Sequence, residues 1–253
     1  MICSHRPHEG HREGAVLSYA SSYRQLADAQ KGRGRGAPAY SLYVNRPVGR
    51  ILAAALNELH LTPNQVSAIS AVFTAAGIVL LATVPASVWL GIVVWLLLAL
   101  GYALDSADGQ VARLRCGGSV AGEWLDHVID AFKTVALPLC VAIGWFRFFP
   151  LEHDAWLLVP LALAIGTTGE FFAMILNDLL RARQGVPQAA QQGGSSLARS
   201  LAGLPTDYGV QCLAFVLWGF PAVFVIVYLL LSVAKFGYLM LALPTWFRRM
   251  KKL

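Results

Sequence analysis

Four aspartates lie between stretches apolar enough to cross a bilayer, in the segment DSADGQVARLRCGGSVAGEWLDHVID at residues 105–130. Carboxylates at a membrane boundary are unfavourable unless a cation compensates their charge. Asp105 and Asp108 are spaced i, i+3, and Asp126 and Asp130 are spaced i, i+4, so each pair falls on one face of its own helix. Two such helices facing each other would bring four oxygen ligands together. The sequence therefore predicts a site for a hard dication such as Mg²⁺, Mn²⁺ or Ca²⁺.

The composition of the chain is that of a membrane protein. Of its 253 residues, 57% are hydrophobic and 13% are charged, whereas soluble domains carry about 25% charged residues. We therefore expect an all-α integral membrane protein. The net charge of +6 fits basic cytoplasmic loops and contact with anionic lipids. Nucleic-acid binding is not expected, because the sequence has no basic module interleaved with aromatic residues.

The chain is expected to fall into four segments. Residues 1–40 are rich in Gly, Arg, His and Ser without sustained periodicity, which predicts a basic, mostly disordered cytoplasmic tail. Residues 41–63 are predicted to contain an amphipathic helix on the membrane surface, beginning near Pro47. Residues 64–245 form the membrane domain, and residues 246–253 form a basic cytoplasmic C-terminus. The apolar stripe of the amphipathic helix consists of Val48, Ile51, Leu52, Ala55, Leu56 and Leu59.

Six transmembrane helices are predicted in the membrane domain, since about 20 apolar residues suffice to cross a bilayer. The first four are expected at about 64–84, 87–107, 121–144 and 154–180. The stretch 208–245 is too long for one span. Gly219 and Pro221 are expected to divide it into a fifth and a sixth helix.

Basic residues predict the orientation of these helices. One side would hold the N-terminal tail, the arginines after the second and fourth spans, Arg199 and the C-terminal RRMKK, whereas the other side would hold only Arg147. The positive-inside rule then places both termini and the aspartates in the cytoplasm, and an even number of spans agrees with that. We expect a multi-pass protein of the inner cell membrane, without a cleavable signal peptide.

Two other groups of potential metal ligands are less informative. His5, His8 and His11 recur every third residue, and they either bind a metal or belong to a flexible tail, which is the simpler interpretation. The cysteines are scattered and are interpreted as unpaired thiols. They are Cys3, Cys116, Cys140 and Cys212.

Further residues with characteristic roles lie beside the aspartates. Glycine lets a ligand or a backbone approach closely, and arginine beside carboxylates suits phosphate recognition. The residues concerned are Gly109, Ala112, Arg113 and Gly122. The complete spacing, D-x-x-D-G-x-x-A-R-x8-G-x3-D-x3-D, resembles the signature of the CDP-alcohol phosphatidyltransferase family at every fixed position. The resemblance extends over residues 40–245.

The resemblance implies a reaction, a cofactor and a set of site residues. A phosphatidyl group, or another CDP-linked phosphoryl-alcohol group, would pass from a CDP-activated lipid such as CDP-diacylglycerol to an alcohol acceptor, with release of CMP. One or two Mg²⁺ or Mn²⁺ ions would be held by Asp105, Asp108, Asp126 and Asp130. Asp130 would also act as the catalytic base for the attacking hydroxyl. The residues that would bind the CDP group are Asp108, Gly109, Ala112, Arg113 and Gly122. A homodimer is also implied.

The acceptor is predicted to be a phosphorylated polyol, such as inositol phosphate or glycerol phosphate, because several cationic side chains could bind its phosphate. The candidate acceptor-binding residues are Lys133, Arg181, Arg183 and Arg199. The segments SLYVNRPVGR and LTPNQVS also resemble the family branch that uses inositol phosphates. Glu170 and Lys235 are expected deep in the membrane, where they either join two helices as an ion pair or line a polar chamber below the metals.

A divalent-cation transporter with an aspartate-lined site is the alternative function. Transporters more often place their ligands near mid-membrane, on broken helices within internal repeats. Here the carboxylates are predicted at one face of the membrane, and the sequence shows no such repeat. The sequence therefore favours an enzyme of phospholipid synthesis, and binding of a cytidine nucleotide would separate the two hypotheses.

Overall fold

The computed structural model describes residues 18–29, 38–115, 117–186, 201 and 203–253, and every regular element in these ranges is a helix. Five helices are long and apolar enough to cross a membrane, which confirms the predicted all-α membrane fold. They are α3 (Pro63–Thr83), α4 (Val88–Leu114), α5 (Val120–Phe148), α6 (Leu158–Arg183), which the 3-10 helix η2 (Asp154–Leu157) precedes, and α9 (Pro221–Met250).

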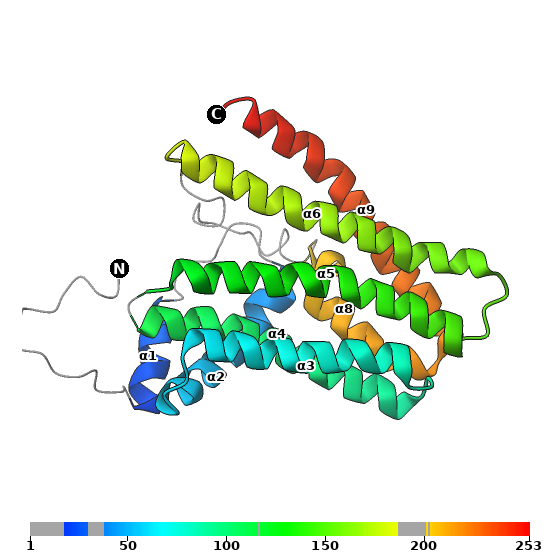
Figure 1. Ribbon diagram of the computed structural model, residues 1–253, viewed down its shortest axis with the longest axis horizontal. Coiled ribbons are helices and arrows are strands. Elements are labelled where there is room, and N and C mark those ends of the chain that lie inside the picture. Colours follow the sequence, from blue (N-terminus) through cyan, green and yellow to red (C-terminus); the bar gives the residue numbers. More distant parts are fainter. Residues whose placement is uncertain (1–17, 30–37, 116, 187–200, 202) are drawn as a thin grey trace, which may run out of the picture.

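The predicted fifth span is shorter than a membrane-spanning helix. It consists of α8 (Tyr208–Ala214) and the 3-10 helix η5 (Phe215–Gly219), which follow the 3-10 turn η4 (Leu204–Thr206). At about 1.5–2.0 Å per residue these two elements are about 20 Å long, against about 30 Å for the hydrocarbon core. Figure 1 shows that α8 begins beside the middle of the bundle. The predicted break at Gly219 and Pro221 is present, but the segment before it does not have the length of a span.

The ends of the long helices that are predicted to face the cytoplasm lie together at one end of the bundle. In Figure 1, α3, α4, α5 and α6 run side by side and α9 crosses them obliquely. The connections from α3 to α4, from α5 to α6 and from η5 to α9 lie at one end of the bundle. The other end carries α1 (Tyr19–Ala29), α2 (Arg46–Glu58) and the C-terminal ends of α4, α6 and α9.

The interface between α3 and α4 is close because small side chains meet there. The hydroxyl of Ser70 donates a hydrogen bond to the carbonyl oxygen of Gly101 at 2.8 Å, and a Cβ on Gly101 would overlap the side chain of Thr74. Small residues let membrane helices approach closely and form hydrogen bonds between them. This interface fixes the position of α4 just before the turns that carry Asp105 and Asp108.

Aromatic side chains hold the opposite end of the bundle together. Trp218 of η5 packs against Phe149 after α5 and Phe224 of α9, with ring centroids 4.7 Å and 5.0 Å away. Trp145 adds further edge-to-face contacts with Phe224 and Tyr228. These rings fix the short α8–η5 segment and the start of α9 against the rest of the bundle.

Helix α2 occupies the segment in which an amphipathic helix was predicted. Its small residues Ala53 and Ala54 are buried, in a helix that packs on α4. Three residues of its predicted apolar stripe face outward, since Val48, Ile51 and Leu59 are 41%, 48% and 68% exposed, whereas Leu52 and Leu56 pack against the core. An outward apolar face is the arrangement expected of a helix lying on a membrane surface.

Helix α1 lies inside the N-terminal segment that was expected to lack regular structure. Leu26 of α1 is buried, and the Arg50 side chain of α2 lies 5.0 Å from the centre of the Tyr23 ring. An isolated helix of this length is marginal in water, so contacts with α2 stabilise it. A π-helix, η1 (Ser41–Asn45), leads from the following segment into α2.

Several residues singled out in the sequence lie outside the described ranges. They are Cys3, His5, His8, His11, Cys116 and Arg199. The two cysteines that are described, Cys140 and Cys212, are free thiols, as predicted.

Candidate active site

The aspartates lie well inside helices α4 and α5. The second span was expected to end near residue 107, but α4 continues to Leu114. Helix α5 begins at Val120, where the hydroxyl of Ser119 caps it by accepting a hydrogen bond from the backbone N–H of Gly122 at 3.0 Å. Asp108 precedes the end of α4 by six residues and Asp126 follows the start of α5 by six, about 9 Å in each case. The two aspartate pairs therefore reach the same level of the bundle.

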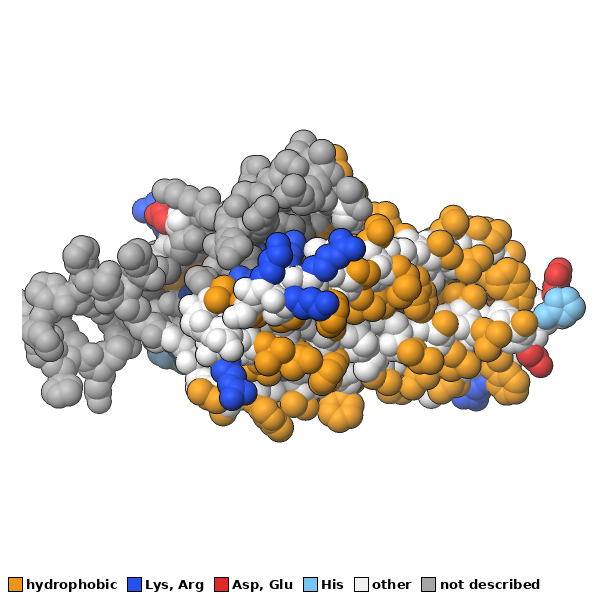
Figure 2. Space-filling model, turned by 90° about the horizontal axis from the view of Figure 1, so that it is seen from above, with side chains coloured by type: hydrophobic (Ala, Val, Ile, Leu, Met, Phe, Trp, Pro, Cys, Tyr) orange, Lys and Arg blue, Asp and Glu red, His pale blue; other side chains and the backbone are white. Residues whose placement is uncertain are grey.

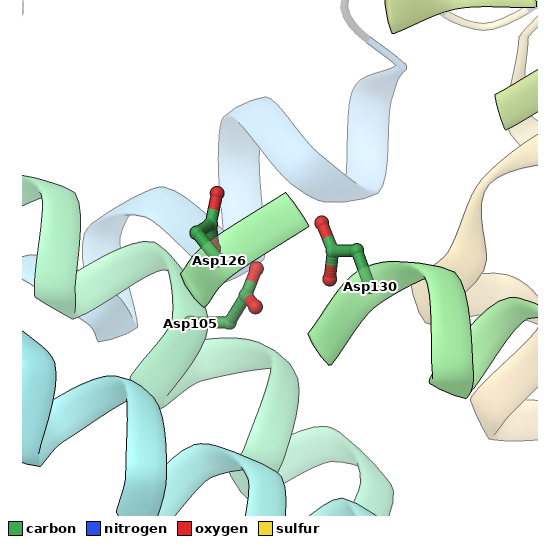
Figure 3. Close-up of side chains that lie close together, drawn as sticks. All are labelled: Asp105, Asp126 and Asp130. Carbon is green, nitrogen blue, oxygen red and sulfur yellow. The ribbon is translucent and has the colours of Figure 1, made fainter. Parts of the chain in front are cut away.

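Three of the four aspartates form a cluster. Asp105, Asp126 and Asp130 each offer a carboxylate oxygen, and these oxygens lie within 4.8 Å of one another. Figure 3 shows the three side chains directed toward a common space between α4 and α5. Two oxygen ligands on opposite sides of a dication are about 4–5 Å apart, since each lies about 2.0–2.6 Å from the ion. The cluster therefore has the ligand type and the spacing that fit a hard dication.

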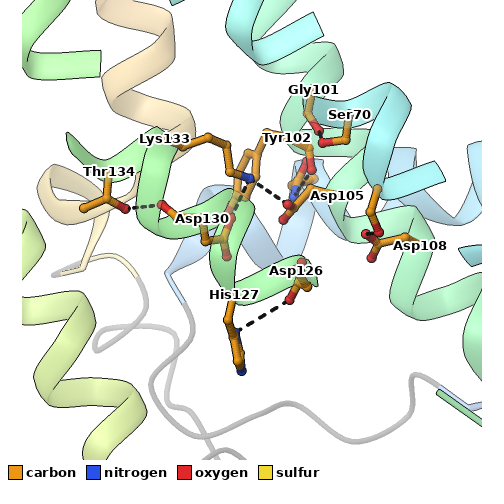
Figure 4. A network of polar contacts seen from close by, with 12 residues as sticks. Ser70, Gly101, Tyr102, Asp105, Asp108, Asp126, His127, Asp130, Lys133 and Thr134 are labelled. Carbon is orange, nitrogen blue, oxygen red and sulfur yellow. Dashed lines mark hydrogen bonds and ion pairs between the residues drawn. The ribbon is translucent and has the colours of Figure 1, made fainter. Parts of the chain in front are cut away.

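Lys133 compensates part of the charge of this cluster. Its Nζ lies 2.7 Å from Oδ1 of Asp105 and 2.5 Å from Oδ1 of Asp130, as Figure 4 shows. Its side chain is 14% exposed, so these ion pairs are largely shielded from solvent. Buried carboxylates without a cation would be strongly unfavourable. Lys133 thus joins α4 to α5 at the point where the aspartates converge.

Asp108 is held apart from the cluster by helix α3. Its Oδ2 accepts a hydrogen bond from the hydroxyl of Ser67 at 2.5 Å, and both residues are buried. Ser67 precedes Asp108 by 41 residues, and a single sequence carries no signal that joins the two. The hydrogen bond directs Asp108 toward α3, so the four predicted ligands do not form one group.

A cavity of about 680 Å³ opens beside Asp108 and Asp126, between the start of α3, the end of α4 and the start of α5. It is lined by four of the five residues predicted to bind CDP: Asp108, Gly109, Ala112 and Gly122. We call it the donor-side cavity. Arg113 is not among its lining residues, and Arg115 is. The structure therefore brings together most of the predicted nucleotide-binding residues and adds a cation that the sequence reasoning did not assign.

The two predicted glycines among the residues that line the donor-side cavity differ in what they allow. A Cβ on Gly109 would meet no atom within 4 Å, so this glycine leaves space beside the cavity. A Cβ on Gly122 would lie 2.9 Å from Oδ1 of Asn64, so this glycine lets α5 approach the start of α3. Gly109 thus leaves open space beside the cavity, whereas Gly122 serves the packing of two helices.

Arg115 is positioned by residues outside the membrane helices. Its Nε donates a hydrogen bond to Oδ1 of Asn57 at 3.2 Å. Nδ2 of Asn57 donates in turn to the hydroxyl of Ser22 in α1, also at 3.2 Å. The N-terminal helices α1 and α2 are thereby linked to the wall of the donor-side cavity.

A second cavity, of about 340 Å³, lies beside the other two aspartates, Asp105 and Asp130. We call it the acceptor-side cavity. Side chains from α4, α5, α6, α8 and α9 line it, including Lys133 and the pair Glu170 and Lys235. The sequence reasoning missed most of its polar wall. The residues not predicted are Tyr102, Thr134, Thr167, Tyr208 and Gln211.

The predicted acceptor-binding residues are only partly brought to this cavity. Lys133 lines it, whereas Arg181 and Arg183 lie in the last turn of α6 and are not among its lining residues. The predicted contact between Glu170 and Lys235 is present, with Oε2 and Nζ 3.6 Å apart. Both side chains face the acceptor-side cavity, so the pair forms part of a polar chamber.

Comparison with known proteins agrees with this geometry. A model of the CDP-alcohol phosphatidyltransferase family matches residues 60–245, the part of the chain that carries all four aspartates and every residue that lines the two cavities. A search among curated proteins finds no match. The family match covers most of the chain, and so this protein belongs to the CDP-alcohol phosphatidyltransferase family.

Proposed function

We propose that the protein transfers a phosphatidyl group, or another CDP-linked phosphoryl-alcohol group, from a CDP-activated lipid to an alcohol acceptor, in a metal-dependent reaction that releases CMP. Its family makes it a membrane transferase of phospholipid synthesis. The observation that carries the finer proposal is the position of the aspartates. Asp108 and Asp126 line one cavity and Asp105 and Asp130 line the other, so the aspartates lie between two cavities, where two substrates would meet.

The donor-side cavity is proposed to bind the cytidine diphosphate part of the donor. Asp108, Gly109, Ala112 and Gly122 would form its wall. A pyrophosphate needs fixed cationic hydrogen-bond donors, which a guanidinium group supplies well. We assign the phosphate contact expected of Arg113 to Arg115, because Arg115 lines the cavity.

The proposed metal ligands are Asp105, Asp126 and Asp130, whose carboxylate oxygens lie within 4.8 Å of one another. A dication bound there would supply positive charge for the pyrophosphate as its phosphoanhydride bond breaks. Asp108, held by Ser67 at 2.5 Å, would face the nucleotide and complete the site from the donor side.

Asp130 is proposed to be the catalytic base, because it lines the acceptor-side cavity and belongs to the carboxylate cluster. The acceptor oxygen would attack the phosphorus that carries the lipid, forming a new P–O bond. The bond from that phosphorus to the CMP oxygen would break, and CMP would leave with the electron pair. The proton of the acceptor hydroxyl would pass to Asp130. Such a transfer depends chiefly on positioning the reactants and on the placed base.

The proposed topology has both termini and the donor-side cavity in the cytoplasm. The C-terminal ends of α4, α6 and α9, with their basic residues, lie at the end of the bundle that also carries α1 and α2. Figure 2 shows hydrophobic side chains over the opposite half of the molecule, with acidic and histidine side chains at its tip. An excess of Lys and Arg on one side supports the cytoplasmic assignment. We also propose that the protein lies in the inner cell membrane and forms a homodimer.

The proposal is tested by incubating the purified full-length protein with CDP-diacylglycerol, Mg²⁺ or Mn²⁺ and a panel of alcohols, and by measuring CMP release. We expect release that requires an alcohol, stops in excess chelator and returns with the metal. Binding of CDP without any CMP release from the whole panel would contradict the transferase assignment. Cation uptake into vesicles without cytidine binding would instead support the transporter.

A further inference from the structure

Away from the proposed metal ligands, the charges of the acceptor-side cavity are balanced within its own wall. The wall contains the carboxylates of Asp105, Asp130 and Glu170 and the ammonium groups of Lys133 and Lys235. Lys133 is bound to both aspartates, at 2.7 Å and 2.5 Å. Lys235 is paired with Glu170 at 3.6 Å. Each cation that the described part of the chain contributes to this wall is therefore already paired with a carboxylate.

The cavity lies where an additional charge would be unfavourable. Lys133, Glu170 and Lys235 are each near the middle of a long apolar helix, in α5, α6 and α9 respectively. The middle of a membrane helix is remote from water, and an unpaired charge there is strongly penalised. A substrate that enters the cavity with a net charge would need an unpaired group of opposite sign in the wall.

Two of the arginines predicted to bind a phosphorylated acceptor, Arg181 and Arg183, lie in the last turn of α6 and do not line this cavity, and the third, Arg199, lies outside the described residues. Arg181 follows Glu170 by eleven residues on α6, which corresponds to about 16 Å along the helix axis. Arg183 lies still farther along the same helix. An acceptor phosphate beside Glu170 and Lys235 would thus add negative charge next to a carboxylate, where Lys235 is already paired with that carboxylate.

The pair Glu170 and Lys235 is suited to contact a substrate. Its separation of 3.6 Å is longer than the 2.7–2.9 Å typical of a tight charge-assisted hydrogen bond, and the side chains are 16% and 21% exposed. Each group therefore keeps the capacity to hydrogen-bond with a molecule in the cavity. The wall also offers the hydroxyls of Thr134 and Thr167 and the amide of Gln211.

From this balance we infer that the acceptor is a polar alcohol with no net charge, and that Glu170 and Lys235 select it. The inference rests on the proposed function, since it names the substrate class of the same site. Two kinds of molecule share this chemistry, namely uncharged polyols and zwitterionic alcohols that carry one amino and one carboxylate group. This inference differs from the prediction made from the sequence, in which the acceptor was a phosphorylated polyol.

The first arm of the test compares acceptors by CMP release from CDP-diacylglycerol. The probes are glycerol and inositol as uncharged polyols, serine as a zwitterion, ethanolamine as a cation, and glycerol phosphate and inositol phosphate as anions. We expect one of the first three to have the highest kcat/KM. Highest kcat/KM for a phosphorylated acceptor or for ethanolamine would overturn the inference and leave the proposed function intact. No CMP release with any probe would instead count against the proposed function.

The second arm changes the charge balance of the cavity. Glu170→Gln leaves Lys235 without its carboxylate, so the ratio of kcat/KM for anionic over neutral acceptors should rise by about tenfold or more. Lys235→Gln should shift the ratio toward ethanolamine. The KM for the CDP-lipid should stay unchanged in both variants. Glu152→Gln, in the exposed connection before α6, is the matched control and should alter neither ratio.

A charge-swapped variant separates a specificity role from a merely structural ion pair. Glu170→Lys combined with Lys235→Glu preserves the pair and the net charge, so thermal stability should be close to wild type. Activity should persist with a polyol acceptor and should fall with a zwitterionic one, whose two charges would meet the reversed pair. If both single Gln variants lower the melting temperature but leave every acceptor ratio unchanged, the pair is structural only and the inference is wrong.

Discussion

Asp126 and Asp130 lie one turn apart on α5, yet they line different cavities. Asp126 belongs to the wall of the donor-side cavity and Asp130 to that of the acceptor-side cavity. Residues spaced i, i+4 on a helix are neighbours, with Cβ atoms about 5–6 Å apart. The spacing of this pair therefore sets the distance between the two proposed substrates. It gives a physical reason for two aspartates one turn apart in the same helix.

A bound dication should stabilise the folded protein, because it would hold α4 and α5 together through Asp105, Asp126 and Asp130. A ligand at a hundred times its dissociation constant stabilises the folded state by about 2.7 kcal/mol. The melting temperature in detergent should rise with Mg²⁺ or Mn²⁺ and fall with chelator. Lys133→Met should show a larger metal-dependent rise than wild type, since the variant lacks the ammonium that pairs with two of these carboxylates. Equal melting temperatures with and without metal in both proteins would contradict the metal assignment.

Ser67→Ala should weaken donor binding, because Asp108 would lose the hydroxyl that orients it at 2.5 Å. Leaving a buried polar group without its partner costs about 1–3 kcal/mol, so the donor KM should rise by about tenfold. The acceptor KM should not change, and Ser67→Thr should restore most of the loss. Ser70→Ala, one turn later on α3, removes a hydrogen bond to Gly101 and serves as the control. It should lower stability without a selective change in donor KM.

Arg115→Ala should raise the donor KM more than Arg113→Ala, since only Arg115 lines the donor-side cavity. Loss of one charge-assisted contact is worth about 1.5–3 kcal/mol, or about tenfold to a hundredfold in affinity. Asn57→Ala should have a smaller effect in the same direction, because Asn57 positions the Arg115 side chain at 3.2 Å. Binding of CDP measured by calorimetry checks all three variants. A larger loss in Arg113→Ala would return the phosphate contact to that residue.

Much of this site could be predicted from spacing within one segment of the chain. The aspartate pairs, Gly109 and Gly122 are close in sequence, so helical periodicity and residue chemistry indicate their common role. The roles of Ser67 and Arg115 could not be seen, because they depend on contacts with Asp108 and Asn57, which are 41 and 58 residues away. Tertiary packing likewise decides that Arg115, and not Arg113, lines the donor-side cavity.

The limits of the fold prediction have a similar cause. The apolar stretch after residue 207 has the composition of two spans, but α8 and η5 pack as a short segment around Trp218. Helix α1 has only 11 residues and depends on α2 for its burial. Composition indicates which segments are apolar enough to lie in a bilayer, whereas the length of a helix and its packing depend on long-range contacts.

The division of roles between Asp126 and Asp130 is the central claim, and parallel measurement of donor binding and CMP release in Asp126→Asn and Asp130→Asn tests it most directly. Both substitutions keep the side-chain shape, and circular dichroism would confirm that the helices are intact. Asp130→Asn should bind the CDP-lipid nearly as well as wild type, while its turnover falls by about two to four orders of magnitude, the range for a placed base. Asp126→Asn should lose metal-dependent donor binding together with turnover. Near-normal turnover in Asp130→Asn, or unchanged donor binding in Asp126→Asn, would contradict the account.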